Sequence, residues 1–303
     1  MVLPNFLIFG VQKAGTTSIY DYLKQHPQVF MSPRKETDFF CRDLSIPISA
    51  DEPRQTRGGR QRILTIEDYE SLFARVGDEV AIGEASPNYL FTHERSVPGI
   101  QKYVPDAKLI AILRNPVERA YSDYLMHVRQ VVGNRSPLAE QVKESGESSH
   151  TLLKGRYCEG IKHFIEVFGR EQVKIFLYDE LRRDSAGLMR QIYEFIGVDP
   201  SFDADTGRKQ QTAQVPKNLS INQLLQTNNP LRSLAGSILR KVMPEERRQQ
   251  LRSRLIAANS TGKEGLPLSA EDRQLLEDYY RDDVRQLQDL IGYDLSGWLD
   301  LKV

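Results

Sequence analysis

The stretch FLIFGVQKAGTT, residues 6–17, decides how this 303-residue chain folds. Residues 6–9 are an apolar run with the length of a buried β-strand, and Gly10 ends that run. After the loop, residues 17–25 carry Ile19, Tyr20 and Leu23 at helical spacing. The order strand, tight loop, helix is the setting in which backbone N–H groups and a helix dipole bind a phosphate group.

The loop, residues 10–17, comes close to the nucleotide-binding pattern GxxxxGK[ST] but departs from it at one position. Thr16 follows the second glycine where the pattern has lysine, and the lysine stands inside the loop as Lys13. From there its ammonium group can reach the terminal part of a bound phospho-anhydride, to which Thr16 and Thr17 also offer hydroxyl groups. A strand-to-helix turn without a ligand remains the alternative when the loop is considered alone.

Short apolar runs and helical stretches alternate along the rest of the chain. The strand-like runs lie at residues 80–82, 108–113 and 173–177, and the helical stretches at residues 69–75, 117–131 and 161–168. This alternation predicts an α/β fold of three layers, in which helices cover both faces of a central parallel sheet.

A long helix is expected near the end of the chain, from the N-cap Ser269 to Gly292. We therefore expect a single domain over residues 1–303. Its α/β core would comprise residues 1–198, and a mainly helical part, residues 199–303, would pack on that core.

Composition excludes several classes of protein. The chain has 41 Lys and Arg against 41 Asp and Glu, so it lacks the positive charge of a protein that coats nucleic acid, and we expect no nucleic-acid partner. Cys41 and Cys158 are too few for a disulfide framework or a zinc site, and no metal is expected. No run approaches the ~20 apolar residues that span a bilayer, and the N-terminus lacks signal-peptide features, so we expect a cytoplasmic protein.

A second group of polar residues lies in LRNPVERAYSDY, residues 113–124. Arg114 stands at the carboxyl end of a predicted strand, where open α/β sheets bind ligands. Asn115 and Pro116 then start a helix, and Ser122 lies about two turns into it. An arginine and a hydroxyl so placed suit an additional phosphate, although a salt bridge and a solvent-facing serine are the alternatives.

These stretches together resemble the sulfotransferases that use 3′-phosphoadenosine 5′-phosphosulfate (PAPS). The similarity is closest to the branch that contains heparan sulfate sulfotransferases and their bacterial relatives. Further stretches extend the resemblance over most of the chain: SIYDYLKQHP at 18–27, KETDFF at 35–40, GEASPNY at 83–89, GRY at 155–157, LYDEL at 177–181 and GYDLSGW at 292–298.

The resemblance implies a cofactor site. The loop residues would bind the 5′-phosphosulfate, and they are Lys13, Ala14, Gly15, Thr16 and Thr17. Arg114 and Ser122 would bind the 3′-phosphate that distinguishes PAPS from ATP, and Tyr178 would lie near the adenine. Lys263, in the late loop 262–265, would also contact the cofactor, with a solvated loop residue as the alternative.

The resemblance also implies catalytic roles in an in-line transfer of sulfuryl to a hydroxyl or an amine. Glu36 aligns with the carboxylate that acts as general base, and Lys13 would stabilise the bridging oxygen as charge develops on it. The alternative for Glu36 is a surface carboxylate paired with Lys35 or Arg34. The acceptor would be a carbohydrate, a lipid or another small molecule.

Two positions depart from the heparan-type pattern. Asp38 stands where several members have histidine, and Ala85 stands where they have a lysine near the reacting groups. A polyanionic acceptor is therefore less assured, unless Arg34, Lys35 or the arginines of residues 54–62 supply the charge. An ATP-dependent P-loop kinase and a non-catalytic module that binds a nucleotide or an anion remain the competing hypotheses, and the oligomeric state stays open.

Overall fold

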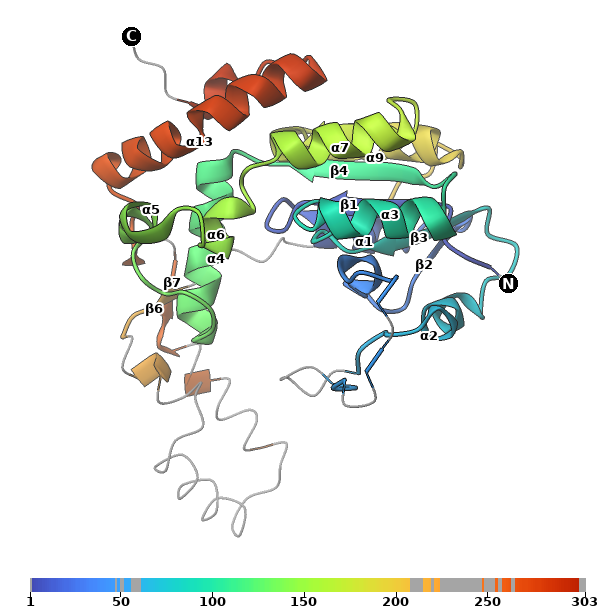
Figure 1. Cartoon of the computed structure of the whole chain (residues 1–303), viewed down its shortest axis with the longest axis horizontal. Helices are drawn as coiled ribbons and strands as arrows, with labels where there is room; N and C mark the ends of the chain where they lie inside the picture. The colour runs from blue at the N-terminus through green and yellow to red at the C-terminus, as the bar shows by residue number, and fades with distance from the viewer. Residues whose placement is uncertain are drawn as a thin grey trace. The chain divides into compact units, whose positions relative to one another are not determined.

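Figure 1 shows the computed structural model of the chain, which describes residues 2–46, 48–49, 52–55, 61–207, 215–218, 221–223, 247, 254–255, 258–262 and 265–299. The chain forms two compact units that alternate along the sequence. The first comprises Met1–Pro116, Arg156–Gln210 and Arg281–Val303, and the second comprises Val117–Gly155 and Gln211–Tyr280. The expected single domain, with its division at residue 198, stays a prediction.

A five-stranded parallel sheet forms the centre of the first unit. Its strands are β1 Phe6–Gly10, β2 Val29–Met31, β3 Ala81–Ala85, β4 Lys108–Leu113 and β5 Val173–Leu177. They lie in the order β2-β3-β1-β4-β5, so β1 pairs with β3 on one side and with β4 on the other. Every residue of β1 is buried, as expected for a central strand that is covered on both faces.

Helices cover both faces of this sheet. α1 Thr16–Leu23 connects β1 to β2 in one direction, while α3 His93–Tyr103 and α7 Cys158–Phe168 belong to connections that run the opposite way. Because such crossovers are right-handed, the two directions place their helices on opposite faces. In Figure 1, α3 and α7 lie in front of the sheet, with α1 and α9 Ser185–Ile196 behind it. The α/β fold of three layers is confirmed.

Aromatic side chains fill the space between sheet and helices in the first unit. The rings of Phe9 on β1 and Phe164 on α7 have centroids 4.1 Å apart. On the other side, His26, just after α1, contacts Tyr193 of α9, with centroids 4.7 Å apart. Within the sheet, the ring of Phe6 lies over Gly83 of β3, where an added Cβ would be 2.1 Å from the Cζ atom of Phe6.

The second unit is built mainly from helices. Its elements are α4 Pro116–Gln130, of which Pro116 belongs to the first unit, α5 Leu138–Ser145, α6 His150–Leu153, the paired strands β6 Val215–Pro216 and β7 Ser260–Thr261, and α13 Ala270–Ile291 up to Tyr280. Arg119 of α4 is fully buried, pairs with Asp123 at 3.3 Å and donates to the carbonyl of Thr151. The hydroxyl of Tyr280 donates to the carbonyl of Leu152 at 2.8 Å.

Most predicted elements are confirmed, one has different bounds, and several were not predicted, among them α3, α9 and β2. β2 was not predicted, because three residues are too few to show a period. The helix predicted at 69–75 begins earlier, as α2 Ile66–Glu70, and is followed by the short 3-10 helix η2 Ser71–Phe73. The reason is a capping box, in which the Thr65 side chain accepts from the amide of Asp68 and the Asp68 side chain accepts from the amide of Thr65.

The expected ends of α13 are present. Ser269 accepts a hydrogen bond from the amide of Asp272 at 3.0 Å, and Gly292 follows the helix with a φ of 72°. The remaining short elements of the first unit are η1 Phe39–Cys41, α8 Tyr178–Arg183 and η4 Ser296–Trp298. Among the residues that the structure describes, no helix is both long and apolar enough to cross a membrane.

Replacing Gly83 by alanine should destabilise the first unit. The new methyl group would overlap the ring of Phe6, which is itself fully buried between two neighbouring strands. Overpacking of this kind costs about 1–3 kcal/mol. Urea denaturation should show the loss as a lower midpoint in Gly83→Ala. Gly297→Ala is the control, because nothing lies within 4 Å of an added Cβ there; an equal effect of both substitutions would contradict the prediction.

Candidate functional site

Predicted site residues gather at one edge of the parallel sheet. Because the five strands are parallel, the segments that follow them all leave from the same edge. Lys13 follows β1, Glu36 follows β2, Ala85 ends β3, Arg114 follows β4 and Tyr178 follows β5. The connection after β1 leaves toward one face and those after β3 and β4 toward the other, and open α/β sheets bind ligands at such a reversal.

The loop after β1 has the backbone of an anion-binding turn. Lys13 and Gly15 both have positive φ angles, of 71° and 83°, and α1 begins directly after Gly15. The first amide groups of a helix have no acceptor one turn earlier, so those of Thr16 and Thr17 stay available to an anion. A Cβ at position 15 would lie 2.6 Å from Leu181 and 3.1 Å from Tyr178, so glycine is required for space as well as for φ.

Arg114 joins this loop to Tyr178. Its guanidinium group donates from Nη1 to the carbonyl oxygen of Lys13 at 2.9 Å and lies 4.7 Å from the centroid of the Tyr178 ring. The structure thus brings together three of the predicted cofactor-binding residues. Arg114 is 101 positions from Lys13 and 64 positions from Tyr178 in the sequence, and the order of the strands makes the three residues neighbours. The result is a cationic group over an aromatic ring beside the loop.

Residues from distant segments hold Arg114 in place. The Tyr157 hydroxyl donates to the carbonyl of Arg114 at 2.9 Å, and the Asp283 carboxylate accepts from the amides of Tyr157 at 2.8 Å and Cys158 at 3.2 Å. Burial raises the pKa of Asp283 to about 6, an effect that these two N–H donors partly offset. Asn115 donates from its side chain to the carbonyl of Trp298 at 2.8 Å. Sequence reasoning marked the GRY and GYDLSGW stretches without giving them this role.

Glu36 lies in a turn that is attached to the end of β3. Its amide donates to the carbonyl of Ala85 at 2.8 Å, and its side chain, 38% exposed, forms an ion pair with Lys35 at 2.7 Å. The pairing with Lys35, which was the alternative to a catalytic role, is therefore present. Glu36 nevertheless lies at the same end of the sheet as Lys13. Its partner Ala85 is the last residue of β3, and the amide of the next residue, Ser86, donates to the carbonyl of Ile8 on β1 at 3.0 Å.

The turn at residues 36–38 has an unusual backbone. Glu36 and Asp38 have φ angles of 58° and 52°, in the left-handed region that glycine tolerates and other residues avoid. Each such residue costs on the order of 1–3 kcal/mol and persists only where surrounding contacts hold it. The Asp38 side chain accepts a hydrogen bond from the Asn88 side chain at 3.3 Å. Asp38 therefore contacts the loop that follows β3.

A buried carboxylate, which sequence reasoning missed, lies beneath this turn. Glu84 on β3 is fully buried and accepts hydrogen bonds from the hydroxyls of Thr37, Ser86, Tyr89 and Tyr69. We call these five residues the Glu84 cluster. Burial raises the pKa of Glu84 to about 7, although the hydroxyl donors pull it downward. The only signal in the sequence was a charged residue inside an apolar strand.

Ser122 and Lys263 are the two remaining residues predicted to bind the cofactor. Ser122 is half-buried on α4 in the second unit, about two turns after the start of the helix, as expected. Lys263 lies outside the described residues, as do Arg57 and Arg60 of the arginine-rich loop. Of that loop, Arg62 forms an ion pair with Glu52 and donates from its amide to Arg54 at 2.8 Å.

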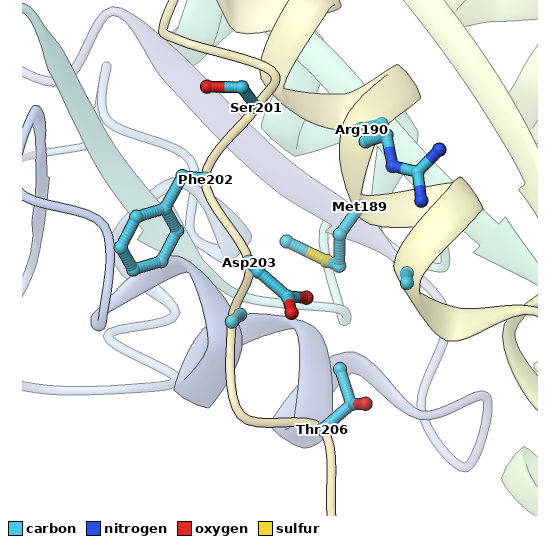
Figure 2. A pocket seen from close by; sticks show the side chains of 8 residues that line it. Met189, Arg190, Ser201, Phe202, Asp203 and Thr206 are labelled. Carbon is cyan, nitrogen blue, oxygen red and sulfur yellow. The ribbon is translucent and has the colours of Figure 1, made fainter.

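A separate pocket of about 430 Å³ lies between α9 and the segment 201–206. Figure 2 shows its lining, in which Asp203 and Met189 project toward the space between helix and segment. None of the predicted site residues lines it.

In the described ranges, no three His, Cys, Asp or Glu side chains form a group that could hold a metal ion. Burial raises the pKa of the free thiols Cys41 and Cys158, to about 12 and about 11.

Comparison with known proteins gives a consistent picture. The sequence pattern of the sulfotransferase family matches residues 4–203, which is well over half of the chain. A sulfotransferase of known crystal structure from Alicyclobacillus acidocaldarius superposes with a TM-score of 0.69 at 27% identity, over 98% of this chain and 99% of that one.

Two curated relatives are much longer proteins. The bifunctional heparan sulfate N-deacetylase/N-sulfotransferase 1 of Caenorhabditis briggsae is 28% identical over 218 residues, 67% of this chain and 24% of the relative. The human carbohydrate sulfotransferase 15 is 32% identical over 257 residues, 65% of this chain and 44% of the relative. The chain therefore spans less than half the length of these relatives.

The raised pKa of Glu84 predicts a dependence of stability on pH. Between pH 4.5, the ordinary value for a glutamate, and about pH 7, the folded protein holds a proton that the unfolded chain releases. The free energy of unfolding should therefore fall as pH rises through this window and level off above it. At about 1.4 kcal/mol per pKa unit, the effect has an upper limit of about 3 kcal/mol.

Urea denaturation of wild type and Glu84→Gln between pH 4 and 8 measures this effect. The difference in free energy of unfolding between the two proteins should change across the window in favour of Glu84→Gln as pH rises. Glu194→Gln, on the exposed side of α9, should follow wild type at every pH. Parallel curves for wild type and Glu84→Gln would show that Glu84 titrates close to its ordinary value.

Proposed function

Because the chain belongs to the sulfotransferase family, we propose that it transfers a sulfuryl group from PAPS to a hydroxyl or an amine of its acceptor by in-line displacement. The observation that carries the proposal is the meeting of Lys13, Arg114 and Tyr178 at the end of β1. That meeting provides an anion-binding loop, a guanidinium group and an aromatic ring beside one another. PAPS requires all three kinds of contact, because it has two phosphate sites and an adenine.

The residues present fit this cofactor. Lys13 and Gly15, with their positive φ angles, form a tight loop directly before α1, where a 5′-phosphosulfate would be bound by residues 13–17. Arg114 is proposed to bind the 3′-phosphate together with Ser122, and Tyr178 to contact the adenine. Lys263 is proposed as a further contact. When bound, the cofactor supplies an activated sulfuryl group, and no metal ion is proposed.

Each catalytic residue has one task in this proposal. The Glu36 carboxylate accepts the proton of the acceptor hydroxyl or amine as the new bond to sulfur forms. The Lys13 ammonium group stabilises the negative charge that develops on the bridging oxygen as the bond to sulfur breaks. Lys35 forms an ion pair with Glu36 at 2.7 Å and so lies beside the proposed base.

For the acceptor we propose a carbohydrate, a lipid or another small molecule rather than a nucleic acid. Ala85 is fully buried and brings no positive charge to the end of β3. Positive charge for an anionic acceptor would therefore come from other residues, and Arg34 and Lys35 are the nearest cations to Glu36 in the sequence. The lone thiols Cys41 and Cys158 support a reducing, cytoplasmic location.

The structure offers little support to a kinase. Nucleotide kinases of the P-loop type place lysine after the second glycine and use an acidic residue as a magnesium ligand. Here Thr16 follows Gly15, and the residue after β4 is Arg114.

Arg114→Ala should remove the preference for a 3′-phosphate. Wild type should be stabilised against heat by 3′-phosphoadenosine 5′-phosphate (PAP) more than by ADP or ATP with magnesium, because only PAP reaches Arg114. Loss of one charge-assisted contact costs about 1.5–3 kcal/mol, or about one to two decades in the Kd for PAP. Melting temperatures at increasing nucleotide concentration measure this difference.

Arg183→Ala serves as the control, since Arg183 is exposed on α8 and should leave the affinity for PAP unchanged. Equal losses of PAP and ADP affinity in Arg114→Ala would show that Arg114 does not bind the 3′-phosphate. Stabilisation of wild type by ATP with magnesium, but not by PAP, would favour a kinase instead.

Substitutions of the two catalytic residues should separate binding from turnover. Glu36→Gln should bind PAP as wild type does and lose at least about a hundredfold in kcat, the usual contribution of a general base. Lys13→Ala should lose both PAP affinity and turnover. Turnover is measured as PAP released from PAPS, with de-N-sulfated heparan oligosaccharide, p-nitrophenol and a long-chain alcohol as trial acceptors.

Glu194→Gln is the matched control for the loss of one carboxylate, and its rate should equal that of wild type. A rate close to wild type in Glu36→Gln would exclude Glu36 as the base. Activity that survives in both Glu36→Gln and Lys13→Ala would favour a non-catalytic module, with the turnover arising from a contaminant.

A further inference from the structure

Residues 84–86 hold the turn of Glu36 at three consecutive positions. The amide of Glu36 donates to the Ala85 carbonyl at 2.8 Å, the hydroxyl of Thr37 donates to Glu84 at 3.1 Å, and the amide of Asp38 donates to the Ser86 hydroxyl at 3.0 Å. The acceptors are the three consecutive residues 84–86, which end β3 and follow it. Each residue of the turn thus has its own hydrogen-bond partner among residues 84–86.

Glu84 orders the hydroxyl groups of this contact. In the ionised form that Glu84 takes above about pH 7, its carboxylate accepts hydrogen bonds and donates none, so each hydroxyl that donates to it has a defined direction. Because Ser86 donates its proton to Glu84, the Ser86 oxygen is left to accept from the amide of Asp38. Thr37 donates to Glu84 in the same way, and its oxygen accepts from the amide of Phe39 at 3.3 Å.

Burial makes this arrangement specific. Glu84, Thr37, Ser86 and Tyr89 are each at most 5% exposed, so water does not replace a lost partner. Among the described residues, Glu84 forms no ion pair, and its hydrogen-bond partners are hydroxyl groups. The members of the cluster therefore depend on one another for their hydrogen bonds.

The turn needs such support because of its backbone. Both Glu36 and Asp38 have left-handed φ angles, which neither would retain in a free loop. Thr37, which lies between them, is the one side chain of the turn that reaches the buried carboxylate. We infer that Glu84 is a positioning residue that acts through Thr37 and Ser86 to fix the turn of residues 36–38, and with it the direction of the Glu36 carboxylate. This inference rests on the proposed role of Glu36 as the base.

Thr37→Val tests the inference at the link between the cluster and the turn. Valine keeps the size of threonine and removes the hydroxyl. The amides of Glu36 and Asp38 should then exchange with solvent about tenfold faster, as expected when one hydrogen bond is lost. Hydrogen exchange of the full chain, followed on the peptide that spans residues 34–39, measures this change without any acceptor.

The same variant should lose turnover but keep binding. Misplacement of a catalytic group by about 1 Å lowers a rate by up to about a hundredfold, so kcat in Thr37→Val should fall by about ten- to a hundredfold. The stabilisation by PAP should stay at the wild-type value. The KM for whichever trial acceptor wild type sulfates should also be unchanged. Thr37→Ser, which restores the hydroxyl, should recover most of both the rate and the protection from exchange. Glu84→Gln should behave like Thr37→Val.

Tyr69→Phe is the matched control. The Tyr69 hydroxyl reaches the same carboxylate at 3.5 Å but contacts no residue of the turn, and phenylalanine keeps the stacking on Phe39. This variant should lose some stability yet keep the exchange of the turn and the rate. If Thr37→Val and Tyr69→Phe behave alike in exchange and in kcat, Glu84 contributes to stability only and the inference is wrong.

Glu36→Gln, measured beside these variants, distinguishes the role of Glu36 as the base from the positioning role of Glu84. A silent Glu36→Gln with faster exchange in Thr37→Val would overturn the base assignment and keep the support of the turn. An impaired Glu36→Gln with unchanged exchange and rate in Thr37→Val would overturn the positioning role of Glu84 alone.

Discussion

The pairing of β1 with both β3 and β4 is the interaction on which the rest of this structure depends. Parallel hydrogen bonding on both sides of one buried strand aligns the carboxyl ends of neighbouring strands at a single edge. The register places Ile8 opposite both Ala85 and Ile110. Residues that follow three separate strands thereby become neighbours, because of the order in which the strands are connected.

Around that edge, polar residues are held by other polar residues rather than by apolar packing. Arg114 is braced through Tyr157 by Asp283, and the turn of Glu36 is braced through Thr37 by Glu84. Both bracing carboxylates are largely buried, and burial raises the pKa of each. Since a buried polar group is stable only with its partners in place, these contacts restrict the site to one arrangement.

Much of the fold and part of the site could be predicted from the sequence. The apolar run before Gly10 and the helical spacing after the loop identified β1, the loop that follows it and α1, because strand length and helical spacing are local properties. The alternation of strands and helices identified the parallel sheet. β2 escaped prediction because it has three residues, and α2 began early because Thr65 and Asp68 form a capping box.

By itself, the sequence determined which residue types stand after each strand, and so which groups are available for chemistry: a lysine and two threonines after β1, a glutamate after β2 and an arginine after β4. Only the tertiary structure decided that the Arg114 guanidinium lies between the Lys13 carbonyl and the Tyr178 ring, and that Glu84 lies beneath the turn of Glu36. The physical reason is that these contacts join segments 47 or more residues apart. Their geometry depends on strand order, register and burial, which no local pattern of residues encodes.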